Sequence, residues 1–88
     1  MYLHIGQNVM ILKKNIVCIM DIENTTNSNI TKKFLKNMQI NGQIINVTND
    51  LPKAFIVYKE KNITSVYITQ FSSSTLIKRY SAAINEMT

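Results

Sequence analysis

Two side chains in the sequence, a histidine and a cysteine, are of the types that often act as general base or nucleophile. His4 is the only histidine, and it lies in the alternating segment Tyr2–Ile5, a pattern typical of a half-buried strand. Cys18 lies within the aliphatic run Ile16–Met20, and apolar surroundings raise the pKa of a thiol and make it unreactive. We therefore expect His4 to be structural, and Cys18 to be buried and dispensable for function. Because no nucleophile is paired with a base, the sequence predicts that the protein is not an enzyme.

The five carboxylates form no recognisable metal-binding or acid–base motif. Asp21 and Glu23 have the spacing that places two side chains on one face of a strand, which leaves a metal site there as a minor alternative. Two glycines are too few for a glycine-rich loop around a phosphate. The sequence therefore predicts no metal, no cofactor and no small-molecule substrate.

Positive charge is the main chemical signal. Ten Lys and Arg residues stand against five Asp and Glu residues, and the net charge of +5 favours polyanions such as nucleic acid. Exposed cations can neutralise phosphates, and such contacts supply most of the non-specific affinity for DNA. The alternatives are a lysine-rich composition of the kind that AT-rich coding produces, and an ordinary solvated surface. The candidate DNA-binding residues are Lys13, Lys14, Lys53, Lys78 and Arg79.

These cations are expected in three kinds of position. Lys13 and Lys14 are expected at an exposed hairpin tip, and Lys53 at the start of a strand. Lys78 and Arg79 are expected on the last helix, after the serine cluster 72–74. That cluster can cap the helix by accepting bonds from its first N–H groups, and the same groups can bind a phosphate. Capping is the simpler interpretation, and both remain open at this point.

Periodicity divides the chain into short strands and two helices. Alternating or β-branched runs predict strands at 2–5, 9–12, 16–22, 43–47, 53–58 and 63–69. Apolar residues four apart, Ile30, Phe34 and Met38, predict a helix over 30–40 with lysines on its wet face. A second helix is predicted over 75–84. The order βββ-α-βββ-α indicates one α+β domain over residues 1–88, with mainly antiparallel pairing.

Two of these strands are apolar on both faces, at Ile16–Met20 and at Ala54–Tyr58. A strand of this kind is covered on both sides, and two short helices offer little material for the second cover. The charged content of 17% is also below the roughly 25% of an average soluble domain. We therefore expect a homo-oligomer.

Nothing in the sequence predicts secretion or membrane insertion. The N-terminal residues lack the basic region and long apolar run of a signal peptide. The apolar runs are far shorter than the roughly 20 residues that cross a bilayer. We therefore expect a cytoplasmic protein without a membrane partner.

Four segments carry a resemblance to a known family: Tyr2–Gly6, Lys14–Val17, Pro52–Val57 and Ser73–Arg79. Together they resemble the RemA/RemB family of bacterial regulators of biofilm extracellular-matrix genes, and the likeness extends from residue 2 to about residue 82. The resemblance implies a regulator that binds DNA as a ring-shaped homo-oligomer, with basic loops repeated around the ring.

By position, Lys13 and Lys14 fall at the turn where this family carries a basic residue, and Lys53 matches a basic residue at the start of the following strand. The chain departs from the family at Asp50-Leu51, where RemA-like members carry adjacent arginines. Two hypotheses follow. The net charge favours an oligomeric, DNA-binding transcriptional regulator of matrix genes. Asp50-Leu51 favours a cytoplasmic oligomeric adaptor or structural protein that binds protein partners without DNA.

Overall fold

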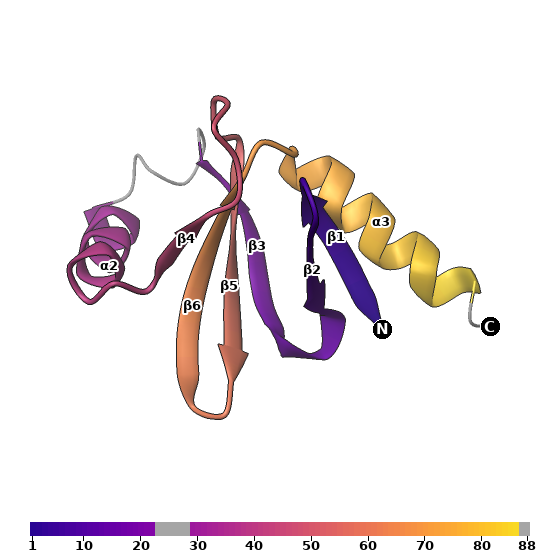
Figure 1. Cartoon of the computed structure of the whole chain (residues 1–88), viewed down its shortest axis with the longest axis horizontal. Helices are drawn as coiled ribbons and strands as arrows, with labels where there is room; N and C mark the ends of the chain where they lie inside the picture. Colours follow the sequence, from indigo (N-terminus) through magenta and orange to yellow (C-terminus); the bar gives the residue numbers. More distant parts are fainter. Residues whose placement is uncertain (23–28, 87–88) are drawn as a thin grey trace.

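Strands dominate the part of the chain that the structure describes (Figure 1). The structure is a computed structural model that describes residues 1–22 and 29–86, with the side chains of residues 1–22 and 29–81. The strands are β1 (Tyr2–Gly6), β2 (Val9–Leu12), β3 (Ile16–Asp21), β4 (Ile44–Asn46), β5 (Ala54–Glu60) and β6 (Ile63–Thr69). The helices are α2 (Asn29–Ile40) and α3 (Ser73–Glu86), and η1 (Lys13–Asn15) is a single 3-10 turn. The predicted order of strands and helices is therefore confirmed.

The strands form two sheets. β1 and β2 pair as an antiparallel hairpin, and the remaining strands form a four-stranded sheet with the order β3-β5-β6-β4. β3 and β6 both pair with β5 in antiparallel orientation, whereas β4 pairs with β6 in parallel orientation. The expected α+β class with mainly antiparallel pairing is confirmed.

Both faces of the four-stranded sheet are covered by the chain itself (Figure 1). On one face Ile5 of β1 and Leu76 of α3 pack with Ile56 of β5. On the other face Met38 of α2 packs with Phe55. Successive side chains of β5 therefore enter two different apolar clusters, as the alternation of a strand requires. This central strand holds the two layers together.

The β1–β2 hairpin is fixed to the larger sheet by a buried hydroxyl. Thr69 is fully buried, and its Oγ1 donates a hydrogen bond to the Ile5 carbonyl oxygen and accepts one from the Phe71 N–H at 3.1 Å. Gly6 follows at a φ of 141°, and a Cβ at this position would lie 3.0 Å from Cγ1 of Val47. A glycine is required here because the backbone conformation and the close approach both exclude a side chain.

The C-terminus of α2 ends as its sequence predicts. Gly42 adopts a φ of 70°, which glycine reaches without steric cost. The Gln43 N–H bonds the Met38 carbonyl oxygen at 2.8 Å, and the Gly42 N–H bonds the Gln39 carbonyl oxygen at 3.1 Å. These two bonds satisfy carbonyl groups that the end of the helix leaves without partners.

Three sequence expectations about the arrangement of strands and helices are wrong. Lys13 and Lys14 do not lie at a hairpin tip, because η1 links β2 of one sheet to β3 of the other. The strand Ala54–Tyr58 needs no second subunit to cover it, because the β1–β2 hairpin supplies the second cover. Ile30 is 81% exposed, since α2 contacts the sheet further along its length, through residues such as Met38.

Candidate nucleic-acid interface

Lys13 and Lys14 are neighbours in η1 with opposite environments. Lys13 is 6% exposed, its Nζ donates to the Tyr80 carbonyl oxygen at 3.3 Å, and it lies 5.4 Å from the centroid of the Tyr80 ring. The expectation that Lys13 projects into solvent is therefore wrong, because its side chain packs on α3. Lys14 is exposed. The buried Lys13 fixes the backbone from which Lys14 extends.

The register of the sheet brings further lysines to the same end of the molecule as Lys14. The Asn15 side chain donates a hydrogen bond to the Tyr58 hydroxyl at 3.3 Å, which joins η1 to the end of β5. Lys59 and Lys61 follow Tyr58, and both are exposed. We call Lys14, Lys59 and Lys61 the basic end. Figure 1 shows η1 and the β5–β6 turn at the same end of the sheet. The proximity of these lysines to Lys14 depends on strand register, which the sequence alone does not give.

Lys53 lies at the opposite end of the β3–β5 ladder. Its N–H donates to the Thr69 carbonyl oxygen at 2.9 Å, and its carbonyl oxygen accepts from the Ile22 N–H at 3.0 Å, so its backbone is held on both sides. The side chain is exposed and lines a hollow of about 270 Å³ that Asp21 also lines. A carboxylate therefore offsets part of the charge there. The 6 residues of β3, at about 3.3 Å each, place Lys53 about 20 Å from the basic end.

Lys78 and Arg79 are exposed on α3, where Arg79 is held by an aromatic ring and a histidine. The Arg79 guanidinium lies 4.7 Å from the centroid of the Phe71 ring, and its Nη1 lies 3.4 Å from His4 Nδ1. His4 Nε2 is 2.6 Å from the Gln7 carbonyl oxygen, so we assign the proton to Nε2 and the acceptor role to Nδ1. His4 positions Arg79, a role that its place in an alternating strand did not reveal.

The serine cluster caps α3. Ser72 Oγ accepts a hydrogen bond from the Thr75 N–H at 3.2 Å, and the Ser72 carbonyl oxygen accepts one from the Leu76 N–H at 3.1 Å. The side chain that could contact a phosphate is therefore bonded to its own helix. This favours the capping interpretation of the cluster over phosphate binding.

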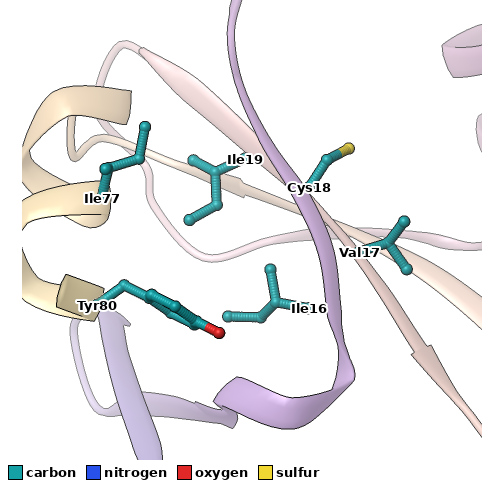
Figure 2. Close-up of a pocket in the computed structure, with 6 residues that line it drawn as sticks. All are labelled: Ile16, Val17, Cys18, Ile19, Ile77 and Tyr80. Atoms are coloured by element: carbon teal, nitrogen blue, oxygen red, sulfur yellow. The ribbon is translucent and has the colours of Figure 1, made fainter. Parts of the chain in front are cut away.

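A hollow of about 230 Å³ lies between β3 and α3 (Figure 2). Ile16 and Ile19 point from β3 toward Ile77 and Tyr80 of α3, whereas the neighbouring Val17 and Cys18 lie on the other side of the strand. The lining of this hollow is mainly apolar side chain. The shift of register between Ile16 and Cys18 marks a bulge at Val17, which is 61% exposed. Ile77, which is 51% exposed, lines the hollow from α3, so apolar side chains are uncovered on both sides of β3.

Cys18 is half-buried, where the sequence led us to expect full burial. Burial raises the pKa of the Cys18 thiol, and a backbone hydrogen bond with Val57 opposes that change to a smaller extent. A thiol with a raised pKa holds its proton and is a poor nucleophile. The environment of Cys18 therefore agrees with the expectation of an unreactive side chain.

The structure offers no support for a metal site or a membrane span within residues 1–22 and 29–86. No group of three or more His, Cys, Asp and Glu side chains converges there. Of the two carboxylates considered from the sequence, Asp21 ends β3 and Glu23 lies outside the described residues. No helix in the same ranges is long and apolar enough to cross a membrane.

Comparison with known proteins places the chain in a family. A family model described as RemA-like, extracellular matrix regulatory protein A-like, matches residues 2–80. Extracellular matrix regulatory protein B of Bacillus subtilis (strain 168) is 32% identical over 79 residues, which cover 90% of this chain and 89% of that protein. The match includes both sheets, η1 and the turn of α3 that carries Arg79. The chain is therefore a member of the RemA-like family of extracellular matrix regulatory proteins.

Proposed function

We propose that the protein is a cytoplasmic, DNA-binding transcriptional regulator of extracellular-matrix genes that acts as a ring-shaped homo-oligomer. The observation that carries this proposal is the placing of Lys14, an exposed cation on a turn that the buried Lys13 fixes to α3. A cation on a fixed backbone reaches a phosphate at a smaller entropic cost than one on a mobile loop. Lys is a point charge without the planar fork of Arg, so these contacts are largely independent of base sequence.

The wide spacing of the cations fits repeated contacts along a duplex better than a single binding site. The basic end and Lys53 lie about 20 Å apart along β3, and Lys78 and Arg79 lie on α3. One exposed contact to a phosphate is weak, but copies of it around an oligomer act together and raise the overall affinity.

Self-association is supported by the apolar surface beside the hollow between β3 and α3. Val17 and Ile77 expose more than half of their surface there. β3 is an edge strand of the four-stranded sheet, but the bulge at Val17 disturbs its free edge. We therefore expect a second copy to pack on these side chains instead of extending the sheet.

The DNA-binding proposal is tested by measuring affinity for long duplex DNA at several salt concentrations. Replacing Lys14 and Lys53 together by Ala should weaken binding and reduce the slope of log K against log[salt] by about 0.9 for each phosphate that is no longer neutralised. The matched control, Lys32→Ala/Lys33→Ala, removes the same charge from exposed positions on α2 and should keep the wild-type slope.

If both double variants weaken affinity equally, net charge alone explains binding and the assignment to Lys14 and Lys53 is wrong. If the wild-type oligomer fails to bind DNA even at low salt, the proposal of a DNA-binding regulator is wrong as a whole.

A second candidate function, an oligomeric adaptor that binds protein partners without DNA, is favoured by the loop before β5. Asp50 is exposed there, and Leu51 beside it is 79% exposed. An exposed leucine next to a carboxylate suits a protein surface better than a phosphate backbone. If uncharged or acidic residues at these two positions prevent DNA binding, replacing Asp50 and Leu51 by arginines should create or strengthen it, as measured in the same salt series.

A further inference from the structure

An apolar groove lies between α2 and the four-stranded sheet, on the opposite face from the β1–β2 hairpin. Its volume is about 370 Å³, within the range of pockets that bind small molecules. Its apolar floor comprises Ile22, Leu35, Ile44, Phe55 and Ile68. All of these except Phe55 are only half-buried, so the groove is a concave apolar surface that solvent can reach. We call it the α2 groove.

Two lysines border this floor. Lys32 and Lys36 are one helical turn apart on α2, both are exposed, and both line the α2 groove. The side chains that line the groove, all within the described residues, include no carboxylate, and residues 29–40 contain no Asp or Glu. The aliphatic stems of the lysines can lie along the apolar surface while their ammonium groups stay in water. The groove therefore combines an apolar floor with a positively charged rim.

We propose that the α2 groove binds a free fatty acid of medium chain length. The alkyl chain lies on the apolar floor and the carboxylate lies between the ammonium groups of Lys32 and Lys36, where charge-assisted hydrogen bonds hold it. The groove, with a volume of about 370 Å³, is large enough for one alkyl chain of medium length. Charge complementarity selects an anionic head, and the size of the groove selects a single chain.

Titration calorimetry of the full chain with butanoate, octanoate and decanoate tests this proposal. Affinity should rise about two- to fourfold for each added methylene while the chain remains within the groove. Decanol, which has a comparable chain and no charge, should bind about tenfold more weakly than decanoate. Amide chemical shifts should change at α2, β4 and β6 and stay unchanged at the β1–β2 hairpin.

Variants distinguish the contribution of the two lysines from that of the apolar floor. Lys32→Gln/Lys36→Gln should weaken decanoate binding about fivefold to tenfold and leave decanol binding unchanged. Lys33→Gln is the control for each single variant, Lys32→Gln and Lys36→Gln, because Lys33 is exposed on the same helix but does not line the groove. Ile44→Phe should fill part of the floor and weaken the binding of both compounds.

Three results would overturn the proposal: no dependence of affinity on chain length, an equal effect of Lys33→Gln, or shift changes confined to the β1–β2 hairpin. Binding to phosphatidylglycerol vesicles without binding to monomeric decanoate would also overturn it, since it would identify α2 as a membrane-surface element. The chain-length series uses the wild-type protein, so the test does not depend on any variant folding. None of these measurements involves DNA, so the outcome is independent of the proposed regulatory function.

Discussion

Adjacent lysines in η1 show how much the environment decides what a side chain does. Lys13 contacts the carbonyl oxygen and the ring of Tyr80, whereas Lys14 is exposed. Two consecutive residues therefore have different roles, one as a structural cation and the other as a candidate phosphate contact. Both residues of the motif Lys13-Lys14 are lysines, so the sequence gives no indication that one side chain is buried and the other exposed.

Replacing Lys13 by Ala should lower the free energy of unfolding by about 1–2 kcal/mol, because the variant has neither the hydrogen bond to Tyr80 nor the packing on its ring. Lys14→Ala should leave the free energy of unfolding unchanged within about 0.5 kcal/mol, as for most exposed side chains. Urea unfolding of the two variants provides the comparison. Equal stability of the two variants would contradict the structural role of Lys13.

The thiol of Cys18 gives a prediction of pH dependence. Burial raises its pKa, so the folded protein binds the thiol proton more tightly than the unfolded chain. The contribution of this group to stability is therefore intact below the unfolded pKa and falls as pH rises above it. Alkylation by iodoacetamide should require a higher pH in the native protein than in urea. The expectation fails if both reactions have the same pH midpoint.

At the scale of elements, the sequence predicted every strand and helix that the structure describes, to within a few residues at the ends. The alternation in 2–5, the β-branched residues in 63–69 and the four-residue spacing of apolar residues in 30–40 are local signals, and local signals survive folding. The buried positions of α2 were harder to predict, because Ile30 fits the helical stripe of apolar residues and is nevertheless exposed. Which turns of a helix contact a sheet depends on where the helix lies, and periodicity carries no information about that.

Gly42 provides a test of the helix end. Gly42→Ala should destabilise the protein by about 1 kcal/mol, because alanine is strained at a φ of 70°. Apart from Gly42 and its two chain neighbours, no atom of the described residues lies within 4 Å of the position that a Cβ would occupy, so any destabilisation comes from the backbone and not from a clash. Gly42→Asn serves as control and should cost less, since asparagine tolerates this conformation better. Thermal unfolding of both variants measures the difference.

At the scale of the whole molecule, the expectation of a homo-oligomer rests on different side chains from those that the sequence indicated. The central strand β5 is covered on both faces within one chain, so its apolar composition is explained without a partner. Among the exposed apolar side chains, Val17 and Ile77 lie beside the hollow between β3 and α3. The sequence could not distinguish the covered strand from these exposed side chains, because the layer formed by the β1–β2 hairpin results from tertiary packing.

Val17→Glu/Ile77→Glu should therefore shift the protein toward monomer, because charges in an apolar interface are dehydrated without gaining a partner. Ile30→Glu is the control, since Ile30 is 81% exposed on α2 and lies outside this surface. Light scattering at several concentrations measures the mass of each variant. A monomeric wild-type protein at micromolar concentration would contradict the oligomer proposal itself.

The candidate site was predictable only in part for a related reason. The sequence identifies cations at turns and strand starts, and Lys14 and Lys53 are exposed as expected. The burial of Lys13 depends on Tyr80, which is 67 positions away in the chain. The contact of Arg79 with His4 spans 75 positions. Contacts over such separations are set by the fold as a whole, and inspection of local sequence cannot reach them.

The bonds that join the β1–β2 hairpin to the last part of the chain also bear on how the protein is made. Thr69 bonds Ile5, and Lys13 bonds Tyr80, so the groups that attach this hairpin to the rest of the molecule lie in segments that a ribosome produces much later. The nascent hairpin gains its hydroxyl partner when β6 leaves the exit tunnel and its helical cover only after α3 follows. Docking of the hairpin is therefore a late event of biosynthesis, because the cluster that buries Leu3 and Ile11 also contains Ile56 of β5 and Leu76 of α3.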